Sequence, residues 1–205
     1  MEFSNGRLLI FAKAPVLGEA KTRLIPALGA AGAAALHERM CHAALELATT
    51  ARLAPVELWC HPDTHHAFFS TCHTMYGVDL HEQRGADLGA RMRNAFDHAL
   101  ASSRYAVIIG TDCPDLTEDD LQMAFRALED GDDVVLGPAV DGGYVLIGLS
   151  RPVPELFAAI DWGSDRVLAQ TRARLADLGL RSHELSPRHD IDRPEDLVLA
   201  TKKIS

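Results

Sequence analysis

The chain has 205 residues, with 20 Lys and Arg against 29 Asp and Glu, so its formal net charge is −9. Hydrophobic residues make up 47% and charged residues 24%, values that are typical of a globular domain and exclude disordered, collagen-like and low-complexity proteins. The excess of acids argues against binding to duplex nucleic acid or to a membrane surface, since both attract basic patches, and no apolar stretch approaches the 18 residues of a membrane span.

The cysteines and the N-terminus favour a cytoplasmic protein. Cys41, Cys60, Cys72 and Cys113 are widely spaced and form no CxxC pair, which indicates free thiols in a reducing compartment. The first 15 residues contain a short apolar run but no small-residue cleavage site. We therefore expect a first strand there rather than a signal peptide.

Short apolar runs alternate with amphipathic segments along the chain. We expect strands at residues 7–12, 56–60, 78–82, 105–110, 133–138 and 144–149. We expect helices near residues 30–50, 63–75, 88–102, 117–130, 164–179 and 194–203. Several strands are almost continuously apolar, which predicts a mostly parallel open sheet with helices on both faces. No linker or repeat interrupts the pattern, so we expect a single α/β domain over residues 1–205.

Three cations, Lys13, Lys21 and Arg23, lie in the loop after the first expected strand. An open α/β sheet binds ligands beyond the carboxyl ends of its strands. Cations and backbone N–H groups at that edge suit a phosphate or diphosphate. A P-loop is excluded, because Pro15 and Ala20 stand where that motif requires glycine. The alternative is an ordinary solvated loop.

The segment after the third expected strand offers a second candidate anion site. Gly85 precedes the helix expected at 88–102, and Arg91 lies in its first turns. Backbone N–H groups at a helix N-terminus attract anions. A structural cap is an equally supported interpretation, because Asp87 is a favourable N-cap residue.

Carboxylates suggest a metal site at the same edge of the sheet. Asp112 follows the buried strand at 105–110 immediately. A hard cation such as Mg²⁺ or Mn²⁺, bridging a protein carboxylate and a substrate phosphate, needs that placement. The alternative for Asp112 is a helix cap. The segment before the last expected helix contains more acidic residues than helix capping requires. The additional acids, Asp190 and Asp192, are therefore candidates to complete the metal site.

Asp141, Gly142 and Gly143 follow the strand at 133–138 at this edge. Two glycines let the backbone turn sharply and approach a ligand closely. Asp-Gly between two apolar runs is also the usual signal of a β-hairpin. The hairpin interpretation is strong for the glycines and weaker for Asp141.

Three other chemistries are not supported. A dinucleotide site requires GxGxxG after the first strand, where this chain has KAPVLGEAK. There is no GxSxG sequence for a serine hydrolase. The cysteines and histidines between residues 60 and 73 lack the CxxC spacing of common zinc sites.

The ordered motifs resemble a family of small bacterial GT-A-like transferases in the nucleotide-diphospho-sugar transferase superfamily. These motifs are FAKAPVLGEAKTRL, QRGADLGARM, IGTDCPDL, GPAVDGGYVLIGL and DIDRPEDL, and the resemblance spans about residues 7–200. The family includes glycosyltransferases of the arsenosugar-biosynthesis type. It is more distantly similar to the guanylyltransferases for molybdenum cofactor and phospholactate.

The resemblance implies that Lys13, Lys21 and Arg23 lie near nucleotide phosphates. It also implies that Asp112 binds Mg²⁺ or Mn²⁺, with Asp192 as the second ligand and Asp190 and His189 as its neighbours. Two departures stand out: the first loop lacks the GxGxR of pyrophosphorylases, and Asp-Cys-Pro replaces the Asp-x-Asp of many glycosyltransferases. The first departure weakens the case for nucleotidyl transfer.

We expect a metal-dependent glycosyltransferase that uses a nucleotide-diphospho-sugar donor and a small-molecule acceptor. Asp141 is the candidate to hold the sugar or an acceptor hydroxyl, or to act as base. Tyr144 and Trp162 are candidates to stack on base or sugar unless they are core residues. The alternatives are a nucleotidyltransferase that releases pyrophosphate and a non-catalytic nucleotide-binding domain. The oligomeric state is left open, a homodimer included.

Overall fold

The computed structural model describes residues 1–198. Within that range the strands are β1 Gly6–Lys13, β2 Val56–His61, β3 Asp79–Glu82, β4 Tyr105–Gly110, β5 Val134–Pro138, β6 Tyr144–Leu149 and β7 Ser182–Glu184. The α-helices are α1 Ile25–Ala51, α2 Ala67–Tyr76, α3 Leu88–Leu100, α4 Glu118–Glu129 and α5 Val167–Asp177. Short 3₁₀ turns cover Thr22–Leu24, Pro154–Phe157 and Pro194–Asp196.

The strands form one seven-stranded sheet in the order β3-β2-β1-β4-β6-β5-β7. Strands β1 to β4 are parallel, β6 runs antiparallel to both β4 and β5, and β7 pairs parallel with β5. The carboxyl ends of β1, β2, β3, β4 and β5 therefore meet at one edge. The predicted mostly parallel α/β sheet is confirmed.

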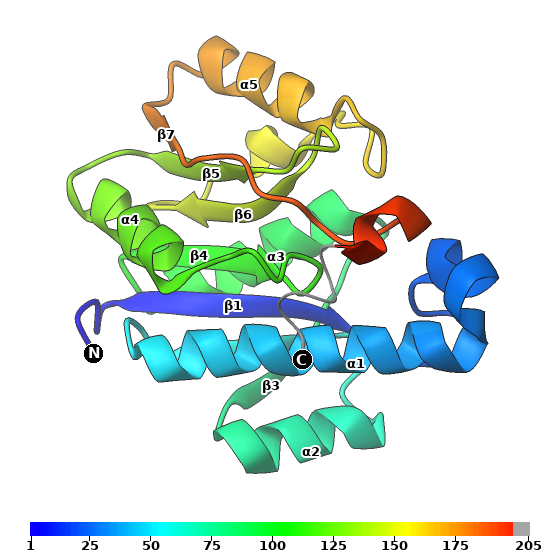
Figure 1. Ribbon diagram of the computed structural model, residues 1–205. Helices are drawn as coiled ribbons and strands as arrows, with labels where there is room; N and C mark the ends of the chain where they lie inside the picture. Colours follow the sequence, from blue (N-terminus) through cyan, green and yellow to red (C-terminus); the bar gives the residue numbers. More distant parts are fainter. Residues whose placement is uncertain (199–205) are drawn as a thin grey trace.

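Helices cover both faces of the sheet (Figure 1). Alternate residues of β1 point to opposite faces, as the period of a strand requires. Leu8 and Ile10 join a core formed with α1, α2 and α4, whereas Leu9 packs in a second core with α3 and α5. Because every central strand is buried on both sides, its sequence is continuously apolar rather than alternating.

The boundaries agree with the sequence to within three residues except at four places. Helix α2 begins at Ala67 rather than near residue 63. Helix α1 starts at Ile25, but Gly29 has φ 70° and ψ 166°, so regular helix resumes where the sequence predicted it, near residue 30. Strand β7 was missed because all three of its residues are exposed. The helix predicted at 194–203 begins as a 3₁₀ turn, and its residues after 198 lie outside the described part.

Strands β5 and β6 form an antiparallel hairpin whose turn contains Asp141 and Gly142. Gly142 has φ +95°, a backbone conformation that residues with a Cβ rarely adopt. The hairpin interpretation of the Asp-Gly pair is therefore correct for the backbone. Cys41, Cys60, Cys72 and Cys113 are free and buried, and none of the helices within residues 1–198 has the length and hydropathy to cross a membrane.

Candidate functional site

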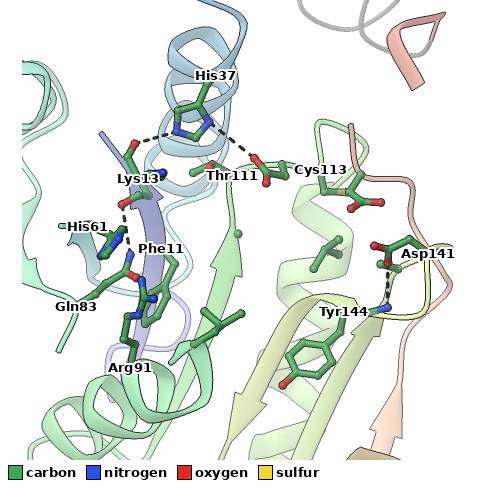
Figure 2. A pocket seen from close by; sticks show the side chains of 18 residues that line it. Phe11, Lys13, His37, His61, Gln83, Arg91, Thr111, Cys113, Asp141 and Tyr144 are labelled. Carbon is green, nitrogen blue, oxygen red and sulfur yellow. Dashed lines mark hydrogen bonds and ion pairs between the residues drawn. The ribbon is translucent and has the colours of Figure 1, made fainter. Parts of the chain in front are cut away.

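A cavity of about 360 Å³ opens at the carboxyl edge of the sheet. Its lining comes from the ends of the first five strands, from α1, α3 and the start of β6, and from the C-terminal segment. Figure 2 shows these residues around the cavity. Among the sequence candidates, the residues that line it are Lys13, Arg91, Asp112, Asp141, Gly143, Tyr144 and Asp190. A neighbouring cavity of about 270 Å³ shares Asp141 and Asp190 and adds Arg23 and Asp192. These segments meet because strand ends of a parallel sheet converge at one edge.

Lys21 joins two of the predicted metal-binding acids. Its side chain is only 3% exposed, and its ammonium lies 2.9 Å from Asp112 Oδ1 and 3.7 Å from Asp192 Oδ1. The same ammonium donates a hydrogen bond to the carbonyl oxygen of Ile191. Arg23 forms a further ion pair with Asp192. The loop after β1 and the C-terminal segment, far apart in sequence, are thereby tied together, and Figure 1 shows them side by side.

The C-terminal segment is held against α4 by an ion pair whose acid is buried. Arg188 donates two hydrogen bonds to Asp120 on α4, of 3.0 Å and 2.6 Å, and the Asp120 side chain is 1% exposed. Asp120 also closes the capping box with Thr117 at the start of α4. Backbone bonds add to this: Ile191 N–H donates to the Asp112 carbonyl at 2.8 Å. The acids at 190 and 192 are thus positioned by the body of the fold.

Asp190 sits in a locally negative environment. Burial and the negative charge of Asp141 raise the pKa of Asp190 to about 6, with Lys21 opposing the shift. Asp141 itself is exposed, and its Oδ1 accepts a hydrogen bond of 2.9 Å from the backbone N–H of Gly143. A bound cation would relieve the repulsion between these two carboxylates.

His37, which the sequence did not single out, lies behind Asp112 and Lys13. It is 5% exposed, its Nε2 lies 2.8 Å from the Lys13 carbonyl oxygen, and its Nδ1 lies 3.9 Å from Asp112 Oδ1. Lys13 itself donates to the Glu19 carbonyl at 2.9 Å. A single histidine in the middle of an Ala-rich helix belongs to no sequence motif. Its position beside the cavity depends on how α1 packs against the sheet.

The α3 side of the cavity contains polar groups too. Arg91 is half-buried, and its Nε has no hydrogen-bond partner within residues 1–198. Gln83 donates to the carbonyl oxygens of Ala12 and Trp59, at 3.3 Å and 2.8 Å. Burial, with the positive charges of Arg91 and Lys13, lowers the pKa of His61. Neither Gln83 nor His61 was a sequence candidate, because each is a single polar residue at a strand end.

The remaining candidates lie in supporting positions. Gly85 is outside the cavity lining, and a Cβ on it would lie 2.7 Å from Ala90. Asp87 accepts a hydrogen bond from Ala90 N–H at 2.7 Å and so caps α3, while Arg91 of the same segment lines the cavity. Gly142 also lies outside the lining.

The two aromatic candidates pack against each other. The rings of Tyr144 and Trp162 meet edge to face, with centroids 6.4 Å apart, and Trp162 also stacks on Phe157. Figure 2 shows the Tyr144 ring pointing away from Asp141. Burial raises the pKa of the Tyr144 phenol. Both rings are half-buried and belong to the core on the α3 face.

The predicted metal-binding acids fit a cation that is shared with a ligand. Within residues 1–198 they form no group of three ligand atoms within 4.8 Å of one another. Asp112 and Asp192 nevertheless flank one ammonium at under 4 Å, and Asp190 lines the same small cavity as Asp192. Mg²⁺ typically takes one or two protein carboxylates, several waters and substrate phosphates. The donor set therefore suits a metal that binds together with a phosphate.

The fold is that of nucleotide-diphospho-sugar transferases. The chain matches a protein from Desulfovibrio desulfuricans G20 provisionally named a nucleotide-diphospho-sugar transferase, with TM-score 0.85, 29% identity, and 93% of this chain and 83% of the other covered. By family, the chain belongs to the bacterial proteins described as "Uncharacterized protein conserved in bacteria (DUF2064)", whose model matches residues 32–164.

Other solved structures share the fold at low identity. One is 4-diphosphocytidyl-2C-methyl-D-erythritol synthase from Anaerococcus prevotii, with TM-score 0.65, 10% identity and 97% of both chains covered. Another is Rv0371c from Mycobacterium tuberculosis in complex with manganese, with TM-score 0.58, 16% identity, and 96% of this chain and 97% of the other covered. No curated protein matches the sequence.

Proposed function

We propose that this protein is a metal-dependent transferase that moves a sugar from a nucleotide-diphospho-sugar to a small-molecule acceptor. One observation carries the proposal: Asp112, at the end of β4, and Asp192, from the C-terminal segment, flank the buried ammonium of Lys21 beside an open cavity. Carboxylates and a fixed cation at the carboxyl edge of an α/β sheet form a site for a diphosphate with its metal.

The cations act on the leaving group. During glycosyl transfer the bond between the anomeric carbon and the phosphate oxygen breaks, and negative charge builds on the departing nucleoside diphosphate. Lys13 and Arg91 line the cavity. Lys21 lines neither cavity, but its buried ammonium pairs with Asp112 and Asp192, which do. Because these cations are positioned before the reaction, they stabilise the developing charge without reorganisation, which is usually the largest catalytic contribution.

The acids bind the metal and the acceptor. Asp112 and Asp192 would hold Mg²⁺ or Mn²⁺, with Asp190 beside them; when bound, the metal offsets charge on the diphosphate. Asp141 faces both cavities and is solvent-exposed. It is positioned to accept the proton of the acceptor hydroxyl as that oxygen bonds to the anomeric carbon. Its orientation is fixed by the N–H of Gly143.

Nucleotidyl transfer is the second candidate. Several structures with the same fold are cytidylyltransferases, and one, a CMP:2-keto-3-deoxy-manno-octonic acid synthetase, was solved with CTP, at TM-score 0.59 and 12% identity. The same cations and metal would then act on a triphosphate, and the acceptor would attack the α-phosphorus with release of pyrophosphate. The single glycine of the first loop, Gly18, still favours the sugar donor.

The products distinguish the two reactions. Protein incubated with Mn²⁺, a panel of nucleotide sugars or nucleoside triphosphates, and acceptor mixtures should release a nucleoside diphosphate in the first case and pyrophosphate in the second. Asp112→Asn should lower turnover at least about 100-fold, since loss of about 2.7 kcal/mol of transition-state stabilisation gives that factor. The matched control is Asp97→Asn, at an exposed acid of α3, which should leave turnover unchanged. Unchanged turnover in Asp112→Asn would refute the proposed role of the metal.

A further inference from the structure

A second cluster of metal-binding side chains lies near the β2–β3 edge of the sheet. Glu57 on β2, His81 on β3 and His98 on α3 each offer one ligand atom, and these three atoms lie within 4.8 Å of one another. His81 Nε2 is 3.7 Å from Glu57 Oε2, and the two imidazole rings have centroids 4.8 Å apart. None of the three lines the cavity proposed to bind the diphosphate.

The fold brings these residues together through register and face. In the parallel β2–β3 pair, Glu57 is opposite Asp79 and Trp59 is opposite His81. Glu57 and His81 therefore point to the same face of the sheet, because side chains alternate along each strand. Helix α3 packs on that face and places His98 close to Glu57 and His81. The residues are separated by 24 and 17 positions in sequence, which is why no spacing motif reveals them.

We propose that Glu57, His81 and His98 bind a divalent transition metal of the zinc class. Two imidazole nitrogens and one carboxylate form a known ligand set for Zn²⁺, with water in the fourth position. Both histidines line a cavity of about 580 Å³, so a metal ion and its water can reach them from solvent. Mg²⁺ is disfavoured, since it prefers oxygen ligands.

Neighbouring groups orient the carboxylate. Trp59 Nε1 donates to Glu57 Oε2 at 3.1 Å, and the Arg7 guanidinium lies 3.5 Å from Glu57 Oε1. Glu57 is 9% exposed, so its carboxylate is held in place rather than free in solvent. Hydrogen bonds of this kind fix the orientation of metal ligands and tune their affinity.

The metal would clamp the edge of the sheet to α3. His98 and Arg91 lie on the same helix, seven residues apart, and β3 leads directly into Gln83, which lines the candidate active-site cavity. Fixing His81 to His98 therefore stiffens one wall of that cavity. The competing explanation is packing alone, since Trp59 stacks on His81 with centroids 4.9 Å apart and meets His98 edge-on at 5.5 Å.

Zinc titration of the chelator-treated full chain tests the site. We expect calorimetry with Zn²⁺ to show one site per chain that survives in Asp112→Asn, which separates it from the proposed phosphate-linked metal. His81→Ala and His98→Ala should each weaken Zn²⁺ binding at least about tenfold, since changes even in outer-shell partners cost about 10–100-fold. His183→Ala, at an exposed histidine on the opposite edge of the sheet, is the control and should bind Zn²⁺ normally.

Two further measurements distinguish loss of the metal site from misfolding, and histidine ligands from cysteine thiolates. Because His98 is exposed, His98→Ala should melt at the wild-type temperature without metal and lose the increase that Zn²⁺ gives the wild type. That increase should be about 5 °C or more at about 100 times the Kd. Co²⁺ should give a visible spectrum of nitrogen and oxygen ligands. Zinc affinity unchanged in both histidine variants, a thiolate charge-transfer band, or no Zn²⁺ binding by the wild type would overturn the proposal.

Discussion

Asp120→Asn should be one of the most destabilising conservative substitutions in this protein. The change removes the negative partner of Arg188 while keeping the shape of the side chain. Asp120 is 1% exposed and Arg188 30% exposed. Breaking a buried ion pair by removing one partner costs about 3–5 kcal/mol. Because Arg188 can regain part of its hydration, we expect about 3 kcal/mol, or a decrease in Tm of about 6–12 °C for a chain of this size.

A second ion pair offers a control with matched geometry. Arg172 donates two hydrogen bonds to Glu184, at 2.8 Å and 2.7 Å, but the side chains are 51% and 33% exposed. Glu184→Gln should therefore cost less than about 1 kcal/mol. Urea denaturation of both variants at pH 7 compares the two pairs directly. If Asp120→Asn costs no more than Glu184→Gln, burial is not what makes the Arg188 pair important.

The effect of Asp120→Asn should also depend on pH. Burial by itself would raise the pKa of Asp120, but hydrogen bonds from Arg188 and Thr117 outweigh burial and hold that pKa below its usual value. A carboxyl whose pKa is lowered by folding stabilises the protein above its unfolded pKa, about 4, and loses that contribution as pH falls toward the folded value. The difference in stability between wild type and variant should be constant from pH 5 to 7 and shrink below about pH 4.

Three further substitutions test local features by thermal or urea denaturation. Gly142→Ala should destabilise by about 1–3 kcal/mol, because φ is +95° and the new Cβ would lie 2.2 Å from the Asp165 carbonyl oxygen; a neutral result would contradict the turn geometry. Gly89→Ala should cost a similar amount and change the Trp162 fluorescence, since its Cβ would lie 2.5 Å from that indole. Without divalent metal, Asp190→Asn should stabilise the folded protein by about 1 kcal/mol at pH 7 but not at pH 4. The pKa of Asp190 is raised to about 6, so ionisation above that pH costs folding free energy, and solvent screens part of this cost. Equal effects at both pH values would exclude this explanation.

The sequence predicted the sheet well because its central strands are buried on both faces. Strand β4 is continuously apolar, from Tyr105 to Ile109, and is predicted to within a residue. Strand β7 is exposed along its length and forms only through pairing with β5, so tertiary context rather than local pattern determines it.

The candidate site was predictable where a residue lies at the end of a strand or just beyond it. Asp112 and Lys13 were found in this way, and both line the cavity. His37 and Asp120 were not found, because their positions depend on how α1 and α4 pack against the sheet. The ion pair of Lys21 with Asp112 was not foreseen either, since a sequence does not show that a surface-type residue becomes buried.

The proposed reaction requires Asp112 and its neighbours to bind a nucleoside diphosphate through a shared divalent metal. Thermal denaturation across Mn²⁺, nucleoside diphosphates, nucleotide sugars and triphosphates, in the wild type and Asp112→Asn, tests it most directly. A ligand at about 100 times its Kd adds about 2.7 kcal/mol of stability. We predict Mn²⁺-dependent stabilisation by one nucleoside diphosphate and its sugar, lost in the variant. Stabilisation that is equal without metal, or that persists in Asp112→Asn, would contradict the proposal.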